Sequence, residues 1–218
     1  MLDSHEKTWR HLLYPEYKGG RKPTPAPLIN NLDQFKTAFG DLGIASIMVV
    51  GYEADDVLST LAVGVAESGG EAIILSTDKG FLSLLSDRIQ VYHHFEQQFV
   101  TAVDVQKKYQ VRHDQLVDYW SLCGDPGNNI KGVPGVGKKT AALLLNQFER
   151  LDEILLQARK ISIKKAAEPL SEDEKVLENF RKPLAKVLAN EETALMCRLL
   201  VTPKLNVELG VNLRTFRI

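Results

Sequence analysis

The spacing of apolar residues changes once along the 218-residue sequence, near His113, and this change constrains the fold most. Before it, short apolar runs at Ser46–Val50 and Glu71–Leu75 end in polar turns and flank a helical stripe over Ala54–Glu67. Such runs are typical of strands buried on both faces, and the strand–helix–strand order favours a right-handed parallel crossover. The sequence therefore predicts an α/β first half, with Ile89–Phe95 as a third candidate strand.

After His113 the apolar spacing is that of helices. Helices are expected over residues 114–123, 139–148, 151–158, 173–187 and 191–200. The final segment, Pro203–Ile218, alternates apolar and polar residues, and we expect extended chain that packs back on the body. The sequence thus predicts an α/β region over residues 1–112 and a helical region over residues 113–218.

Composition excludes several classes of protein. Hydrophobic residues make up 44% of the chain, enough for a buried core, and no apolar run reaches the length of a membrane span. The 27 Lys and Arg residues balance 28 Asp and Glu residues, so a polyanion would have to be bound by local basic patches. Cys123 and Cys197 form no CxxC motif or zinc-ligand spacing, which favours a reducing compartment. We therefore expect a soluble, cytoplasmic protein.

Acidic residues follow two of the predicted strands. Glu53, Asp55 and Asp56 come after the first strand, and Asp78 comes after the second. Ligands of open parallel sheets bind beyond the carboxyl ends of the strands. A single Asp there is ordinarily a helix N-cap, but three carboxylates within four residues repel one another unless a cation compensates them. Oxygen ligands without His or Cys suit magnesium or manganese.

A glycine-rich segment, Gly132-Val-Pro-Gly-Val-Gly-Lys-Lys-Thr140, lies between two predicted helices. It matches a phosphate-binding P-loop through Lys138, but Lys139 stands where the metal-binding hydroxyl should be, and no buried strand precedes it. A nucleotide-binding protein and a purely structural turn are alternatives. The favoured interpretation is a helix-hairpin-helix loop whose backbone approaches a DNA phosphate while the two lysines add positive charge.

Five segments, in the same order, resemble the bacterial and phage 5′–3′ exonuclease and flap endonuclease family, especially its Xni-type (exonuclease IX-like) members. They are Tyr14-Pro-Glu-Tyr-Lys-Gly-Gly-Arg21, Glu53-Ala-Asp-Asp56, Ser76-Thr-Asp78, Gly124-Asp125 and Gly132-Val-Pro-Gly-Val-Gly-Lys-Lys139. The resemblance implies a parallel-sheet, PIN-like nuclease domain followed by a helix-hairpin-helix region. It implies a structure-specific 5′ nuclease that cleaves 5′-flap DNA, as a monomer, in replication and repair.

The resemblance also implies four groups of site residues. The carboxylates that would line a magnesium cleft, with Asp55 the first choice for direct ligation, are Asp3, Glu53, Asp55, Asp56, Asp78 and Asp125. Two basic residues, Lys18 and Arg21, match those near the scissile phosphate. The main-chain carbonyls that would hold a potassium ion belong to Leu122, Cys123, Lys131, Val133 and Val136. The loop that would contact DNA comprises Gly135, Val136, Gly137, Lys138, Lys139 and Thr140.

Departures from the family pattern refine these expectations. Gly80 and Asn128 occupy positions where two-metal members carry Asp, so we predict one tight divalent ion and a weak second one, with manganese able to replace magnesium. Family members also begin upstream of Asp3 with a strand that bears an acidic ligand, so this sequence is expected to be an N-terminally incomplete nuclease. A non-catalytic, structure-specific DNA-binding protein of the same family remains the alternative.

Overall fold

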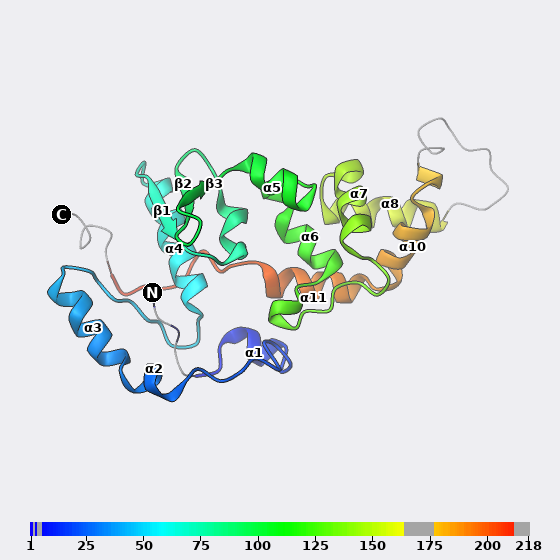
Figure 1. Cartoon of the computed structure of the whole chain (residues 1–218). Helices are drawn as coiled ribbons and strands as arrows, with labels where there is room; N and C mark the ends of the chain where they lie inside the picture. Colours follow the sequence, from blue (N-terminus) through cyan, green and yellow to red (C-terminus); the bar gives the residue numbers. More distant parts are fainter. Residues whose placement is uncertain (2, 4–5, 164–176, 212–218) are drawn as a thin grey trace. The chain divides into compact units, whose positions relative to one another are not determined.

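The computed structural model describes residues 1, 3, 6–163 and 177–211 (Figure 1). The chain divides by compactness into two units. The first unit comprises Met1–Ile74, Ser86–Gln90 and Pro203–Ile218, and the second comprises Leu75–Leu85 and Val91–Thr202. The predicted α/β class with a helical second half is confirmed. The predicted boundary between residues 112 and 113 stays a prediction.

The helices that the described residues of the first unit form are α1 (Trp9–Leu13), α2 (Ala26–Asn30), α3 (Leu32–Asp41) and α4 (Ala54–Glu67). The bounds of α4 are those predicted from sequence, whereas the other three helices were not predicted. Helix α4 begins with Asp55 and Asp56 in its first turn, where negative charge favours the positive end of the helix dipole. Val57 and Ala62 are buried on the face that it turns to the core.

The segment Ser46–Val50 is extended but is not a strand, so the predicted strand and its crossover are wrong. Ile47 is buried against Val57 and Val207, whereas Met48 is exposed. A strand needs the backbone of a partner strand, and within the described ranges this segment has none. Its apolar residues are buried instead by packing one side of the extended chain on a helix and the C-terminal segment.

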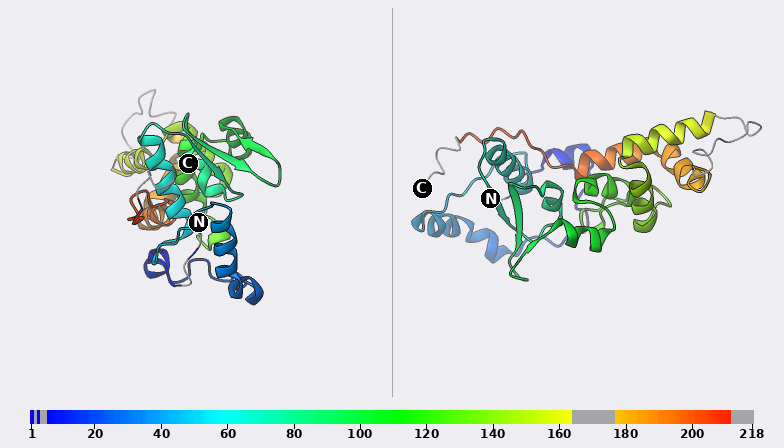
Figure 2. Two further views of the ribbon diagram at one scale, coloured as in Figure 1. Left: turned by 90° about the vertical axis from the view of Figure 1, so that its left-hand side faces the viewer. Right: turned by 90° about the horizontal axis from the view of Figure 1, so that it is seen from above.

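Three strands form one sheet in the order β1 (Ala72–Leu75), β2 (Ile89–His93) and β3 (Gln98–Val100). Strands β2 and β3 are antiparallel and form the hairpin drawn as arrows in Figure 2. The N–H of Ala72 donates to the carbonyl of Arg88 (2.8 Å) and that of Ser76 to the carbonyl of Tyr92 (3.2 Å). This constant offset makes β1 and β2 parallel. Strands β1 and β2 confirm two predicted strands, whereas β3 was not predicted.

Strand β1 is not buried on both faces. Ile74 is 1% exposed, but Ile73 and Leu75 are each 64% exposed. The continuous apolar run was therefore misleading about burial, although it located the strand correctly, because successive side chains of a strand point to opposite faces.

The C-terminal segment 203–211 forms no helix or strand and packs on α4, so the predicted packing on the body is confirmed for these residues, while residues 212–218 lie outside the described part of the chain. Thr60 of α4 donates its hydroxyl to the carbonyl of Lys204 (3.0 Å) and accepts from the N–H of Val207 (3.3 Å). Side-chain hydrogen bonds from the helix thus take the place of strand pairing for this segment.

The second unit is built mainly from α5 (Ala102–Tyr109), α6 (Leu116–Cys123), α7 (Lys138–Phe148), α8 (Leu151–Ile163), α10 (Arg181–Ala189) and α11 (Glu191–Val201). Helix α6 packs against α7 and α11, and α8 packs against α10. The helices predicted over residues 114–123, 139–148, 151–158 and 191–200 are confirmed, although α8 extends past its predicted end. The helix predicted over residues 173–187 is interrupted by a turn at residues 179–180, and its residues 173–176 are outside the described ranges. Helix α5 was not predicted. No helix among the described residues has the length and apolar character needed to cross a membrane.

Two buried polar side chains connect α6 to its neighbours. Gln115 donates to the carbonyls of Leu145 (3.0 Å) and Glu149 (2.9 Å), which are acceptors at the C-terminal end of α7. Asp118 accepts from the N–H of Leu151 (2.9 Å), the first residue of α8. These bonds satisfy backbone groups that helix termini leave without partners, and so fix α7 and α8 around α6.

Candidate functional site

Glu53 stands at the N-cap of α4, yet its side chain does not cap the helix. It is 4% exposed and lies within a cluster of donors instead. Arg10 Nη1 and Tyr17 Oη donate to its Oε2 at 2.8 and 3.0 Å, and Lys18 forms an ion pair with its Oε1. Burial, together with the negative charge of Glu53, raises the pKa of Tyr17, so the phenol stays a donor at any physiological pH. Helix capping therefore does not explain the position of Glu53.

Asp56 is fully buried and both of its oxygens are engaged. Arg10 binds it through two hydrogen bonds of 2.7 and 2.8 Å, and the indole N–H of Trp9 donates to it at 2.9 Å. The N–H of Lys204 adds a fourth bond of 2.8 Å. Burial acts to raise the pKa of Asp56, but the hydrogen bonds and charge of Arg10 outweigh it and hold that pKa below its ordinary value. Asp56 thus joins α1, α4 and the C-terminal segment.

Asp55 and Asp3 are more accessible than these two carboxylates. Asp55 is half-buried in the first turn of α4, and Asp3 is exposed. The Oδ1 of Asp3 accepts a hydrogen bond from the N–H of Ala54 at 2.7 Å, so Asp3 lies beside the acidic motif. The four predicted carboxylates of the first unit therefore lie at or beside the start of α4, in unlike surroundings.

The two predicted basic residues follow α1 in a turn-rich segment. Lys18 is paired with Glu53, and its backbone adopts a left-handed conformation, with φ of 54°. That conformation is uncommon for a residue with a side chain and is found most often at turns and functional sites. Arg21 is exposed three residues later. Lys18 therefore lies beside Glu53, and the roles of Lys18 and Arg21 near the scissile phosphate stay predictions.

The two predicted carboxylates of the second unit also differ. Asp78 is exposed and caps the short 3₁₀ helix η1 (Lys79–Leu84), because its Oδ1 accepts from the N–H of Gly80 at 2.7 Å. Asp125 is 4% exposed. Its Oδ1 pairs with Lys79 Nζ at 2.5 Å, and its Oδ2 accepts from Asn128 Nδ2 at 2.7 Å. Asp78 thus caps a helix, as an isolated Asp commonly does. The negative charge of Asp125 is already neutralised by Lys79.

Among the residues that the structure describes, no three His, Cys, Asp or Glu side chains converge as metal ligands. The six predicted carboxylates are divided between the units, with Asp78 and Asp125 in the second. A single magnesium cleft formed by all six therefore stays a prediction.

The glycine-rich hairpin depends on a close approach of two backbone segments. Gly124 and Gly132 both have positive φ, of 81° and 71°. A Cβ on Gly132 would lie 2.3 Å from the nitrogen of Gly124, and one on Gly124 would lie 2.7 Å from the carbonyl oxygen of Lys131. Neither position accepts a side chain without movement of the backbone.

Two carbonyls of the predicted potassium site, those of Leu122 and Val133, accept backbone hydrogen bonds in this hairpin. The N–H of Val133 donates to the carbonyl of Leu122 at 2.8 Å, and that of Val136 to the carbonyl of Val133 at 3.0 Å. Carbonyl oxygens have two lone pairs, so an oxygen that accepts one hydrogen bond keeps capacity for a cation. The potassium ion itself stays a prediction.

The predicted DNA-contact loop leads into α7. Gly137 is the N-cap, no side chain caps the helix, and its first turn contains no acidic residue. Lys138 and Lys139 are exposed, whereas Val136 is buried, so only its backbone is suited to contact DNA. Uncapped N–H groups at a helix N-terminus form an anion-binding site.

Sequence analysis missed one basic residue at this loop. Lys186, on α10, donates its Nζ to the carbonyl of Gly135 at 3.1 Å. It lies 51 residues away in the sequence, in a helix whose lysine spacing carries no DNA-binding signature. Four further residues of the candidate site were not predicted from the sequence, namely Trp9, Arg10, Tyr17 and Lys79.

Comparison with known families matches the whole chain. Residues 1–121 match the 5′-3′ exonuclease N-terminal resolvase-like domain, and residues 111–218 match the 5′-3′ exonuclease C-terminal SAM fold. The chain is 39% identical over 217 residues to a flap endonuclease Xni of Psychromonas ingrahamii, covering 100% of this chain and 76% of that protein. It is also 37% identical over 217 residues to the flap endonuclease Xni of Aeromonas hydrophila, and the match covers 100% of this chain and 75% of that protein.

Solved structures share the fold. The T5 D15 protein co-crystallized with metal ions superposes with a TM-score of 0.69 at 21% identity, covering 93% of this chain and 74% of that one. The catalytic core of Rad2 in complex with DNA substrate superposes with a TM-score of 0.53 at 16% identity, covering 90% and 61%. The chain therefore belongs to the 5′-3′ exonuclease family and is a structure-specific 5′ nuclease.

Proposed function

We propose that this protein is a magnesium-dependent flap endonuclease with 5′–3′ exonuclease activity, which hydrolyses phosphodiester bonds at a 5′ flap or at a 5′ end beside a duplex junction. The observation that carries the proposal is the half-exposed Asp55 at the start of α4, with Asp3 hydrogen-bonded to the adjoining backbone. Relatives that match the whole chain are named flap endonucleases.

The chemistry of these donors fits a hard divalent cation. Carboxylate oxygens without nitrogen or sulfur ligands suit magnesium, and manganese is the ordinary substitute. Asp55 and Asp3 would hold one tight ion, whose bound form supplies an acidified water and neutralises charge on the phosphate. Lys18, which pairs with Glu53, and Arg21, which is exposed on the same segment, would stabilise negative charge that develops on the scissile phosphate.

The DNA duplex would be held by the second unit. The N–H groups at the start of α7 would bind a phosphate, and Lys138 and Lys139 would add charge that is independent of base sequence. A potassium ion on the hairpin carbonyls would keep the loop in this conformation. The proposal extends to a monomer that acts in the cytoplasm on replication and repair intermediates, as the flap endonucleases named among the bacterial relatives suggest for the substrate.

The direct test is release of a labelled 5′ flap from a branched duplex. We expect release in magnesium, loss of release in EDTA, and recovery when magnesium or manganese is added back. Binding of the flap without release under all metal conditions would make the protein a non-catalytic DNA-binding module. Thermal stabilisation by ATP without DNA binding would instead support the P-loop interpretation.

Replacing both Lys138 and Lys139 by Ala should weaken flap binding and reduce its dependence on salt. Each lost phosphate contact lowers the slope of log K against log salt by about one, so the expected change is about two. Fluorescence anisotropy across a salt series measures both quantities. A matched double variant, Lys107→Ala with Lys160→Ala, removes two exposed positive charges elsewhere in the second unit. Equal effects of the two double variants would mean that net charge, and not the loop, binds DNA.

A further inference from the structure

Asp125 is a buried carboxylate whose negative charge is neutralised within the chain. Its side chain is 6% exposed, and its two oxygens bind Lys79 Nζ and Asn128 Nδ2 at 2.5 and 2.7 Å. Its backbone is fixed as well, because Asp125 and Ile130 exchange hydrogen bonds of 2.8 and 3.0 Å. An ionised carboxylate at such a place is stable only when a cation and further hydrogen bonds compensate it.

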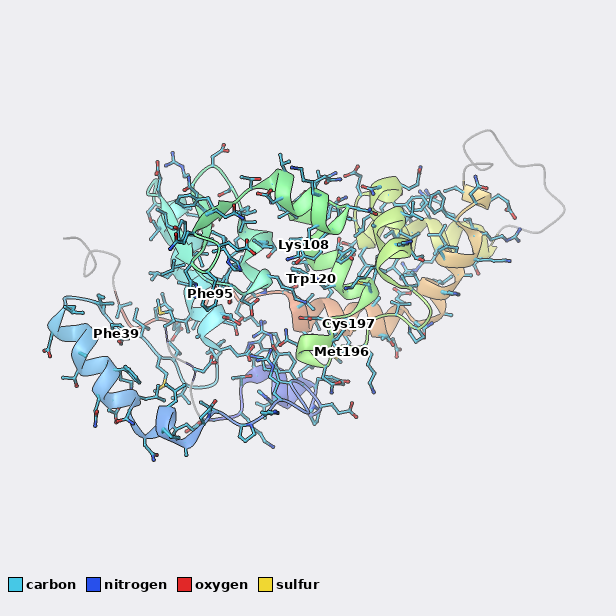
Figure 3. The ribbon with its side chains drawn as sticks, in the orientation of Figure 1. Phe39, Phe95, Lys108, Trp120, Met196 and Cys197 are labelled. Carbon is cyan, nitrogen blue, oxygen red and sulfur yellow. The ribbon has the colours of Figure 1, made fainter. Side chains whose placement is uncertain are left out.

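The ammonium group of Lys79 is held from a second direction. It lies 5.3 Å from the centroid of the Trp120 ring on α6, which is labelled in Figure 3, and is therefore in cation–π range. The Lys79 side chain is 38% exposed and lines a pocket together with Asp78 and Lys108. Lys79 thus presents a fixed positive charge to this pocket while it is bound to Asp125.

Asp78, whose Oδ1 caps η1, is the anionic neighbour in this pocket, and the positions of Gly80 and Asn128 add no further carboxylate. Gly80 has no side chain, and its N–H is donated to Asp78. Asn128 is neutral and turns its amide N–H toward Asp125, so it acts as a donor. A divalent ion at Asp125 would have to displace an ammonium and would meet an N–H group. This environment fits a resident cation and does not fit an added metal ion.

We propose that Lys79 is a built-in cation that takes the place of a second divalent ion at Asp125. Asp125 is then a positioning residue and not a metal ligand. Its ion pair fastens η1 to the loop that precedes the glycine-rich hairpin. The proposal deepens the proposed metal-dependent function, because it limits the ligand set to carboxylates other than Asp125.

The proposal is tested with Lys79→Met, Lys79→Arg, Asp125→Asn and the Lys79→Met/Asp125→Asn double variant of the full chain. Lys79→Met should lower the melting temperature by about 5 °C, since it leaves Asp125 buried without a cation. Lys79→Arg should restore most of the loss, and the double variant should be more stable than the sum of the single effects predicts. Lys107→Met, an exposed lysine of α5, is the matched control and should change little.

Manganese titration by calorimetry provides the second readout. Asp125→Asn should keep the wild-type manganese affinity within about threefold, because Asp125 is then a positioning residue and not a ligand. A tenfold or greater loss of manganese affinity in Asp125→Asn would overturn the proposal, as would strictly additive melting shifts in the double variant. The melting measurements need no metal and no activity, so failure of the flap assay would refute the proposed function without deciding the role of Lys79.

Discussion

Replacing Arg10 by Met should lower the free energy of unfolding by about 3–5 kcal/mol, the range for removing one partner of a buried ion pair. The Arg10 side chain is 5% exposed and is the common donor to Glu53 and Asp56. Met is similar in length and fills the space, but it leaves two buried carboxylates without their main cation. The loss should therefore come from uncompensated charge, not from a cavity.

Urea-induced unfolding at a series of pH values measures this loss and its origin. Because Arg10 holds the pKa of Asp56 below its ordinary value of about 4, the stabilisation is present above that pH and is lost as the pH falls through the lower, folded-state pKa. The difference between wild type and Arg10→Met should accordingly shrink in acid. Lys7→Met removes an exposed charge nearby and should stay within about 0.5 kcal/mol of wild type. A pH-independent loss would mean that packing, and not charge, is responsible.

Replacing Asp55 by Asn should lower the rate of flap cleavage by about a thousandfold or more. Charge stabilisation by a bound metal amounts to several kcal/mol in the transition state, and each 1.4 kcal/mol is about a factor of ten in rate. The change is isosteric and affects a half-exposed side chain, so the melting temperature and flap affinity should change little. Single-turnover cleavage of a labelled flap, with anisotropy for binding, separates the two effects.

Two further variants make the Asp55 result specific. Asp87→Asn removes an exposed carboxylate from a turn and should cleave at the wild-type rate. Asp56→Asn should instead lose stability, because Arg10 would remain buried with one oxygen fewer to bind. Cleavage by Asp55→Asn at the wild-type rate would refute its assignment as a metal ligand.

The unlike roles expected of Asp55 and Asp56 follow from helix geometry. Successive residues of an α-helix are rotated by about 100°, so two adjacent carboxylates in the first turn of α4 face different directions. Asp56 is buried and binds Arg10 and Trp9, whereas Asp55 remains half-exposed. A run of acidic residues in a sequence therefore does not imply that all of them bind one ion.

The sequence by itself determined the elements that depend on local pattern. Helical spacing located α4 and most helices that follow residue 113, because their apolar stripes recur every three or four residues. The glycines of the hairpin were recognisable because positive φ and close backbone approach favour glycine. The strand predicted over Ser46–Val50 was wrong because a strand also requires a partner strand, and the local sequence pattern does not show whether one is present.

Only the tertiary structure decided which charges neutralise which. Arg10 reaches Asp56 across 46 residues, Lys79 reaches Asp125 across the same separation, and the backbone of Lys204 reaches Asp56 across 148 residues. Sequence shows that a carboxylate is present, but its partner depends on which distant segments pack beside it. Burial then makes that partner obligatory, since an ionised group removed from water must be compensated where it lies.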